Sequence, residues 1–140
     1  MRNQSVKQVI PSLNELEGLD DMPEIAQKAI SLVNKKISYP IQVNDIATEI
    51  GISSRHLSRI FKESTGESPR KYFRKLRVNA ARQMVLYTNE KIDKIAISVG
   101  FSSASNLRHH YIDLFSLSPE EERQRVNLFR VNDNSPIPAT

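Results

Sequence analysis

Cysteine is absent from the 140 residues, and its absence excludes several classes of protein at once. A disulfide-stapled secreted scaffold, a thiolate zinc site and a cysteine nucleophile all require the thiol. Tryptophan is absent too, and aromatic residues make up 6% of the chain, so we expect a mostly aliphatic core. No apolar run approaches the roughly 18 residues of a membrane span, and the N-terminus lacks the apolar core of a signal peptide. These absences predict a cytoplasmic protein with no membrane partner.

The signatures of catalysis are missing as well. The sequence contains no phosphate-binding loop, no G-x-S-x-G nucleophile motif and no pair of carboxylates embedded among apolar residues. We therefore expect a protein that is not an enzyme and that needs no cofactor.

Positive charge is unevenly distributed along the chain, although the net charge is only +4. Residues 53–86 contain nine Lys or Arg against two Glu, a net of +7, so all other residues together carry −3. A basic block within a mildly acidic protein is typical of a polyanion binder. The other interpretation of such a block is a solvated helix face.

The spacing of apolar residues predicts an all-α chain, because no segment shows the alternation that a strand requires. Seven helices are expected, at residues 23–37, 43–50, 54–64, 68–87, 92–99, 103–114 and 119–128. Residues 1–22 are expected to form a flexible linker, and residues 129–140 a disordered tail.

Two of these helices have clear candidate core faces. On the first, the apolar face consists of Ile25, Ala29, Leu32, Val33 and Ile37. On the long helix at 68–87, the buried stripe is expected to consist of Phe73, Leu76, Ala80 and Met84.

An internal repeat with a period of about 50 residues is the most informative feature of the sequence. The pairs that carry it are Ile46-Ala47 with Ile95-Ala96, Ile50-Gly51-Ile52 with Val99-Gly100-Phe101, Leu57 with Leu107, Phe61 with Tyr111, and Ser68-Pro69 with Ser118-Pro119. The offset between the copies is 49 before the glycine and 50 after it, so the second turn is one residue longer.

Each copy meets the physical requirements of a helix-turn-helix. A small residue, Ala47 or Ala96, lets two helices approach each other where they cross. Four positions later a glycine can adopt the left-handed conformation that ends the first helix. Ser53 and the Ser102-Ser103 pair can cap the second helices. Two such copies joined by a basic helix are a much stronger signal than one.

At these residues the sequence resembles the DNA-binding domain of the AraC/XylS family of bacterial transcription regulators. The resemblance covers residues 25–125, and further motifs that carry it are His56-Leu57-Ser58-Arg59-Ile60-Phe61-Lys62, Thr65-Gly66-Glu67-Ser68-Pro69, Leu76-Arg77, Ala80-Ala81-Arg82 and Val99-Gly100-Phe101-Ser102-Ser103. It implies two helix-turn-helix subdomains, at 23–67 and 88–128, joined by a linker helix at 68–87. It also implies a transcription regulator, most often an activator, in the bacterial cytoplasm.

The resemblance extends to expected partners. These are double-stranded DNA, RNA polymerase and a sensing or dimerisation domain. That domain is expected to be missing from this chain and joined through residues 1–22 as a tether; the alternative is a stand-alone regulator. A bridge of about 19 residues is roughly 28 Å long at 1.5 Å per residue. Two recognition helices at its ends could therefore reach adjacent major grooves on one side of the duplex. The rival hypothesis is a helical protein–protein module that contacts polymerase or a partner domain.

The first unit supplies the strongest candidates for DNA contact. Base contacts are expected from Ser54, Arg55, Ser58 and Arg59, with Arg59 foremost because a bidentate Arg–guanine pair is the commonest specific contact. Phosphate contacts are expected from Lys62, Lys71, Arg74, Lys75 and Arg82, each of which could instead be a solvated side chain. His56 is expected to be a structural residue that faces the core or the backbone.

The second unit departs from this pattern. Its outward positions are expected to be Ala104, Ser105, Arg108 and His109, with Asn106 at the side, and all five are candidate base contacts. His109 stands where the repeat has Arg59, and His110 stands at a core position. A neutral balance over 103–115 predicts a weaker or more pH-sensitive second unit.

Two further departures concern the last helix. Ser116 replaces Gly66 of the first copy and Glu122 replaces Tyr72, which predicts that this helix docks less firmly than its counterpart.

Metal binding is an alternative role for His109, His110 and Asp113. His109 and Asp113 share a helix face at i, i+4, but zinc needs three or four ligands and the sequence shows no third convergent one. We therefore expect no metal site.

Overall fold

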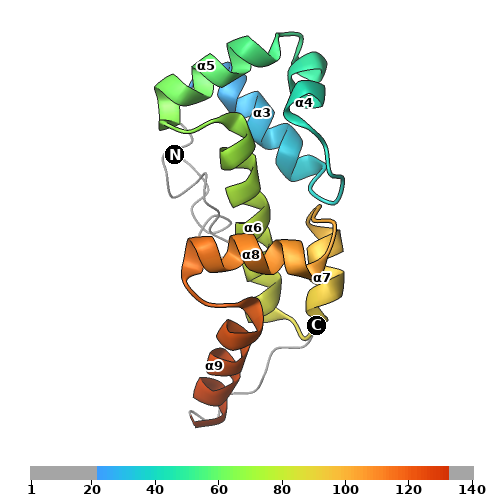
Figure 1. Ribbon diagram of the computed structural model, residues 1–140, viewed down its shortest axis with the longest axis vertical. Coiled ribbons are helices and arrows are strands. Elements are labelled where there is room, and N and C mark those ends of the chain that lie inside the picture. The colour runs from blue at the N-terminus through green and yellow to red at the C-terminus, as the bar shows by residue number, and fades with distance from the viewer. Residues whose placement is uncertain (1–21, 133–140) are drawn as a thin grey trace, which may run out of the picture. The chain divides into compact units, whose positions relative to one another are not determined.

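Seven helices follow one another in residues 22–132, the part of the chain that the computed structural model describes (Figure 1). They are α3 (Glu24–Lys35), α4 (Val43–Ile50), α5 (Ser54–Thr65), α6 (Pro69–Tyr87), α7 (Ile92–Ser98), α8 (Ala104–Phe115) and α9 (Pro119–Asn132). Within those residues there is no strand, so the predicted all-α class and the seven helices are confirmed. The predicted linker at 1–22 lies outside the described residues except for Met22.

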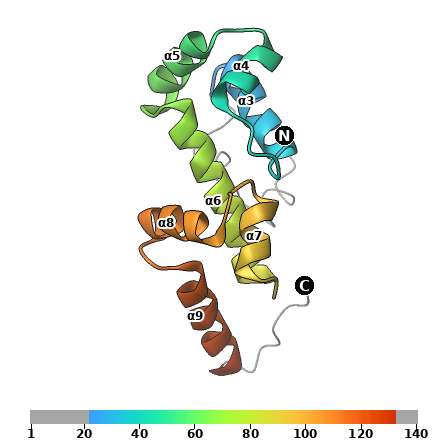
Figure 2. The ribbon, with the colours of Figure 1, turned by 45° about the vertical axis from the view of Figure 1, so that its right-hand side comes forward.

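The chain divides into two compact units, one ending at Leu76 and the other beginning at Arg77. The boundary falls inside α6, so the helix predicted to be a linker contributes residues to both units. Unit 1 consists of α3, α4, α5 and the start of α6, and unit 2 of the rest of α6 with α7, α8 and α9. Figure 2 shows α4 and α5 as the successive short helices of unit 1, and α7 and α8 as those of unit 2.

The core of unit 1 forms where α3 packs against α4 and α5. On α3 the fully buried residues are Ala26, Ala29, Ile30 and Val33. Ile25, Leu32 and Ile37, which the sequence placed on the core face, are only partly buried. The buried face of α3 is thus rotated from the predicted one by about one residue position. Ala26 faces inward, where its small side chain allows the helices to approach closely.

The buried residues of α6 also differ from the predicted stripe. Phe73 and Leu76 are buried as predicted, together with Tyr72, in unit 1. Ala80 and Met84 are only partly buried, and in unit 2 the helix buries Val78, Ala81 and Val85 instead. The buried face of α6 therefore changes between the part of the helix in unit 1 and the part in unit 2.

The last helix is longer than the sequence suggested. α9 continues to Asn132, so residues 129–132 are helical and the prediction of a disordered tail from 129 is wrong for them. The Arg130 guanidinium donates a hydrogen bond to the Leu86 carbonyl at 3.1 Å, which fixes the last turn to the end of α6. The remainder of the predicted tail lies outside the described residues.

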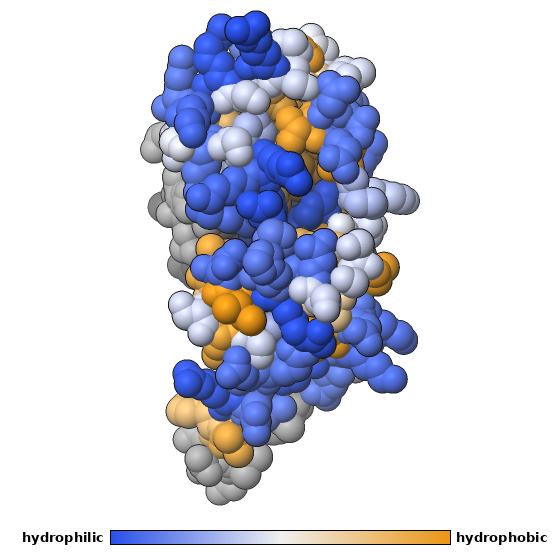
Figure 3. Space-filling view, viewed as in Figure 1, coloured by the Kyte–Doolittle hydropathy of each residue, from blue (hydrophilic) through white to orange (hydrophobic). Residues whose placement is uncertain are grey.

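Surface hydropathy differs between helices. In Figure 3 the surface over α5 is hydrophilic, whereas apolar atoms gather at the far end of α9. Leu128 and Phe129 are the exposed apolar side chains there. Among the described residues, no helix is both long and apolar enough to cross a membrane.

Candidate nucleic-acid interface

The turn between the first two helices of each unit has the same backbone geometry. Gly51 ends α4 with φ +92° and ψ 28°, and Gly100 also has φ +92°. In both turns the residue after the glycine donates its N–H to the alanine carbonyl, Ile52 to Ala47 at 3.0 Å and Phe101 to Ala96 at 2.9 Å. These bonds satisfy carbonyls that a helix end otherwise leaves unpaired. The predicted repeat is therefore confirmed as two helix-turn-helix units.

Each recognition helix, α5 in unit 1 and α8 in unit 2, begins at a serine cap. The Ser53 hydroxyl accepts a hydrogen bond from the His56 N–H at 3.0 Å, and Ser103 accepts from Asn106 at 3.1 Å. Both bonds satisfy an N–H that lies in the first turn of the helix. Serine caps after a glycine turn thus start both recognition helices at equivalent positions, as predicted.

Residues on the outer face of α5 are available for contact. Leu57 and Phe61 bury the inner face, whereas Arg55, Ser58 and Arg59 are exposed. Ser54 is partly buried, and its hydroxyl donates to the Asn44 side chain on α4 at 2.8 Å. His56 is half-buried. Of the four base-contact candidates in unit 1, three therefore face solvent and the fourth is bonded to the preceding helix.

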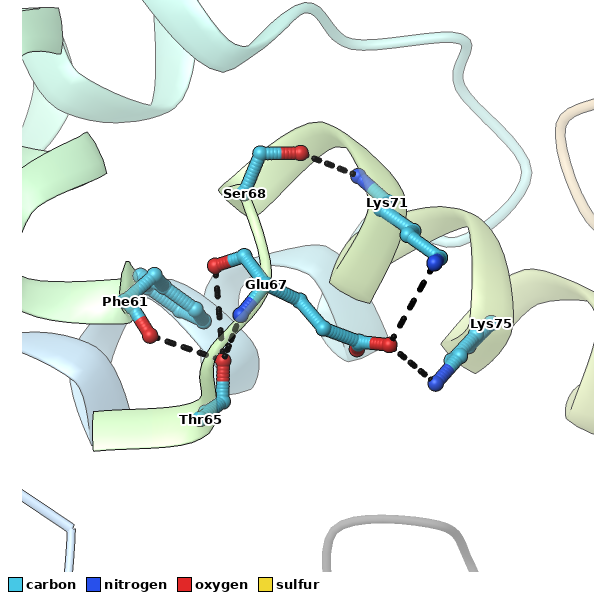
Figure 4. A network of polar contacts seen from close by, with 6 residues as sticks. All are labelled: Phe61, Thr65, Glu67, Ser68, Lys71 and Lys75. Carbon is cyan, nitrogen blue, oxygen red and sulfur yellow. Dashed lines mark hydrogen bonds and ion pairs between the residues drawn. The ribbon is translucent and has the colours of Figure 1, made fainter. Parts of the chain in front are cut away.

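A network at the start of α6 fixes two predicted phosphate contacts (Figure 4). Glu67 pairs with Lys75 and also lies 3.9 Å from the Lys71 ammonium. The Thr65 hydroxyl accepts from the Glu67 N–H at 3.1 Å and donates to the Phe61 carbonyl at 2.7 Å, which holds Glu67 in place. The pairing of Glu67 with these lysines was not predicted, although its i, i+4 spacing to Lys71 is visible in the sequence.

The remaining phosphate candidates differ in their surroundings. Lys62 is exposed and Arg74 is half-buried, both in unit 1. Arg82 is engaged inside unit 2, where its guanidinium hydrogen bonds Glu122 at 2.7–3.2 Å and lies 4.4 Å from the Phe115 ring centroid. Arg77 is buried as well and donates to the Val99 carbonyl at 3.0 Å. Two cations of the basic block thus stabilise unit 2, and Arg82 is not a free phosphate ligand.

The recognition helix of unit 2 presents fewer residues than predicted. Ala104 is buried, so its expected outward position is wrong: it lies on the side of the first turn of α8 that faces the core of unit 2. Ser105, Asn106 and His109 are exposed. The Asn106 amide donates to the Ser102 hydroxyl at 3.2 Å.

Arg108, the fifth candidate of unit 2, is paired with an acid on another helix. Its Nε and Nη2 lie 2.7 and 2.6 Å from Oε2 of Glu120, in the first turn of α9. The hydrogen bond that Arg108 donates to Glu120 raises the pKa of Arg108. Burial favours the neutral form of Glu120, but the bonds to Arg108 and to the backbone outweigh it and lower the pKa of Glu120. The sequence could not reveal this pair, because 12 positions separate its members.

Three possible metal ligands converge on the exposed face of α8. The ligand atoms of His109, His110 and Asp113 lie within 4.8 Å of one another, so the expectation that no third ligand converges is wrong. His109 Nε2 is 4.0 Å from the Asp113 carboxylate, and both side chains are exposed. His110, predicted to occupy a core position, is half-buried and stacks on Phe101 at 5.9 Å between ring centroids.

Comparison with known proteins decides the family. Residues 46–125 match the family described as "Helix-turn-helix domain". A solved structure of an AraC-type DNA-binding domain regulator from Chromobacterium violaceum is 37% identical, with a TM-score of 0.69 over 73% of this chain and 91% of that one. This chain belongs to the AraC/XylS family, as its DNA-binding domain.

The curated relatives are transcription regulators. ArgR of Pseudomonas aeruginosa is 34% identical over 125 residues, which is 89% of this chain and 37% of that protein. GbdR of the same organism is 30% identical over 138 residues, 99% of this chain and 37% of that protein. The chain thus spans just over a third of the length of these two relatives.

This AraC/XylS-type domain departs from its own repeat in the core of unit 2. In unit 1 the Phe61 and Tyr72 rings meet edge to face, with centroids 5.4 Å apart. At the equivalent positions of unit 2 the Tyr111 hydroxyl donates to the buried Glu122 carboxylate, which also pairs with Arg82. Glu122 is therefore held by two partners. The weaker docking of the last helix stays a prediction.

The pKa values of this network follow from its contacts. Burial alone would raise the pKa of Glu122, but the hydrogen bonds from Arg82 and Tyr111 outweigh it and lower that pKa. Burial and the bond to Glu122 raise the pKa of Tyr111. The carboxylate is thus kept charged and the phenol protonated, which is the state that their hydrogen bond requires.

Ser116 ends α8 in the left-handed conformation, with φ +66°, where unit 1 has Gly66 at φ +79°. A side chain in this region costs roughly 1 kcal/mol or more, which glycine avoids. We predict that Ser116→Gly stabilises unit 2 by about 0.5–1 kcal/mol, measured by urea unfolding. Gly66→Ser should destabilise unit 1 by a similar amount, and a loss of stability in Ser116→Gly would contradict the argument.

Proposed function

We propose that this AraC/XylS-type domain binds duplex DNA sequence-specifically through α5 and α8, which enter two adjacent major grooves. The observation that carries the proposal is the outer face of α5, where Arg55 and Arg59 are exposed opposite a buried apolar face. An exposed arginine on a recognition helix can donate two hydrogen bonds to guanine. The repetition of the unit supports a second, similar contact through α8.

The proposed roles follow from exposure and charge. Arg59 contacts a base, and Arg55 contacts a base or a phosphate. Lys62, Lys71, Arg74 and Lys75 contact phosphates. Lys71 and Lys75 lie beside Glu67 at the start of α6, and each exchanges that carboxylate for a phosphate on binding. In unit 2, Ser105, Asn106, Arg108 and His109 remain candidates on α8. Ala104 and Arg82 are left out because they are engaged within unit 2.

We further propose that the domain activates transcription by placing RNA polymerase near its binding site, in the bacterial cytoplasm where the DNA lies. The relatives include a lactose operon transcription activator of Staphylococcus xylosus and the activator RhaS of an Enterobacter species, at 27% and 28% identity. Their names support activation rather than repression.

The salt dependence of binding tests the proposal. Phosphate contacts release counterions, so log affinity falls with log salt by about 0.9 for each contact. We predict that Arg74→Ala weakens binding to all duplex sequences about equally and reduces this slope by roughly one. Fluorescence anisotropy with random and selected duplexes measures both quantities.

Lys28→Ala is the matched control, because Lys28 is exposed on α3, outside the helices proposed to contact DNA, and its substitution removes the same charge. Its slope should stay close to that of the wild type. A flat slope for the wild-type protein would instead favour a protein–protein module, whose exposed Leu128 and Phe129 on α9 would then be the first surface to test.

His109 on α8 is the basis for a predicted pH dependence of DNA binding. Histidine changes charge between pH 5 and 8, and protonated His109 would attract phosphate where unit 1 has Arg59. The titratable groups beside it are Asp113 and His110. Since DNA phosphate favours the charged imidazole, we predict that affinity rises as the pH falls from about 8 to 6.

His109→Gln should remove most of this rise, and His56→Gln should not, because His56 is half-buried at the start of α5. The buffers contain a chelator, since His109, His110 and Asp113 together could hold a divalent ion. Equal pH profiles for the wild type and His109→Gln would assign His109 no role in binding.

A further inference from the structure

Glu120 holds the one arginine on the recognition helix of unit 2. Both Nε and Nη2 of Arg108 converge on a single carboxylate oxygen, at 2.7 and 2.6 Å. Arginine binds carboxylate and phosphate with the same fork of N–H donors. The carboxylate of Glu120 therefore occupies the donors that a DNA phosphate or a guanine would require.

The repeat shows that this acid is not a requirement of the fold. Glu120 follows Ser118-Pro119 at the start of α9, and the equivalent residue of unit 1, after Ser68-Pro69 at the start of α6, is Arg70. Arg70 is exposed. At the same place beside the recognition helix, unit 1 thus carries a cation and unit 2 an anion.

The pair also contributes little to stability. The side chains of Arg108 and Glu120 are 39% and 44% exposed. Ion pairs this exposed contribute little to stability, because water and salt screen them. The capping of α9 depends on other groups, because the Ser118 hydroxyl accepts from the Glu121 N–H and the Glu121 carboxylate accepts from the Ser118 N–H. Neutralising Glu120 therefore leaves the helix start intact.

We propose that Glu120 is a built-in competitor of DNA that lowers the contribution of unit 2 to binding. In the free protein it pairs with Arg108, and in the complex Arg108 must leave it for the DNA while the Glu120 charge stays close to the phosphates. This inference rests on the proposed function. The weaker DNA binding proposed for unit 2 then depends on Glu120 of α9 as well as on the residues of α8.

The test is the affinity of Glu120→Gln for a duplex selected by the wild-type protein, measured by anisotropy over a range of salt concentrations. Affinity should rise about 3- to 10-fold at low salt, and the salt slope should steepen, since the contact between Arg108 and phosphate is no longer offset by the nearby charge of Glu120. Glu120→Arg, which copies Arg70, should give a larger gain. Adding Arg108→Ala to Glu120→Gln should remove most of the gain.

Glu49→Gln is the matched control. Glu49 on α4 pairs with Lys36 at 3.1 Å, and their exposures of 49% and 38% are close to those of the test pair. This variant changes the net charge equally and also releases one cation, so its affinity should change less than 2-fold if the effect is specific to Arg108. An equal gain in the two variants would overturn the proposal in favour of a general charge effect.

The remaining outcomes are also decisive. Lower affinity or lost sequence preference in Glu120→Gln would show that Glu120 positions Arg108 for DNA, and unchanged affinity would show that the pair does not compete; either overturns the proposal. If the wild-type protein shows no salt-dependent duplex binding, the proposed function itself fails. Circular dichroism melting of each variant confirms that the fold is retained.

Discussion

Arg59→Ala is expected to abolish the preference for a selected duplex while leaving much of the affinity for random DNA. Arg59 is exposed on α5, opposite the buried Leu57 and Phe61. A bidentate contact between arginine and guanine contributes about 1–3 kcal/mol of discrimination, which corresponds to roughly 5- to 150-fold in relative affinity. Competition between the selected duplex and a scrambled duplex of equal length measures this ratio directly.

Arg59→Lys separates charge from geometry. Lysine keeps the positive charge near the phosphates but lacks the planar fork that matches the edge of guanine. We therefore expect random-DNA affinity close to that of the wild type, with most of the preference lost. If either variant keeps full specificity, base recognition lies elsewhere and the placement of α5 in the groove is wrong.

The sequence predicted the helices and turns because local groups determine them. Gly51 and Gly100 adopt positive φ, and Ser53 and Ser103 cap the helices that follow, as their positions in the repeat indicated. A glycine turn followed by a serine cap depends on a few neighbouring residues. Such signals are therefore visible without knowledge of the tertiary contacts.

The site was harder to predict, because the partners of its arginines come from distant positions. Arg82 pairs with Glu122, 40 positions away, and Arg108 with Glu120, 12 positions away. In the sequence both arginines belong to patterns typical of DNA contact. Only the packing of α9 against α8 and its hydrogen bonds to α6 reveal that both are engaged.

The polar network of unit 2 replaces an apolar arrangement in unit 1. On α3 the buried stripe is Ala26, Ala29, Ile30 and Val33, and the same spacing on α6 gives Val78, Ala81, Arg82 and Val85. Arg82 thus stands where unit 1 has Ile30. In the repeat, Phe61 corresponds to Tyr111 and Tyr72 to Glu122. Three apolar or aromatic residues in the core of unit 1 thus correspond to three hydrogen-bonded residues in unit 2.

Glu122→Ala should therefore destabilise unit 2 strongly and leave unit 1 almost unchanged. Removing one member of a buried ion pair costs about 3–5 kcal/mol, because the partner loses its counter-charge. Arg82 keeps 37% of its side-chain exposure, so we expect a smaller loss of about 2–3 kcal/mol. Hydrogen exchange detected by mass spectrometry should show faster exchange in α7, α8 and α9 than in α3, α4 and α5.

Acid should act on the same group. The pKa of Glu122 is below its ordinary value of 4.5, so the folded state favours the carboxylate. The resulting stability is fully present above pH 4.5 and is lost as the pH falls through the lowered pKa. Unit 2 should therefore lose protection from hydrogen exchange in acid before unit 1 does. In Glu122→Ala, unit 2 is already less protected at neutral pH, and its protection should depend less on acid.

The triple variant Arg82→Ile, Tyr111→Phe and Glu122→Tyr distinguishes two explanations. Either unit 2 requires the charged network, or it requires only that no buried charge is left without a partner. It gives unit 2 the three groups that unit 1 has at the equivalent positions, Ile30, Phe61 and Tyr72. Replacing a whole buried ion pair by apolar groups of similar volume is often neutral or stabilising, because no charge is left unpaired. We expect the triple variant to recover at least the 2–3 kcal/mol that Glu122→Ala loses, and to remove the part of the acid sensitivity of unit 2 that comes from Glu122. A triple variant as unstable as Glu122→Ala would show that the packing around α9 requires the charged network.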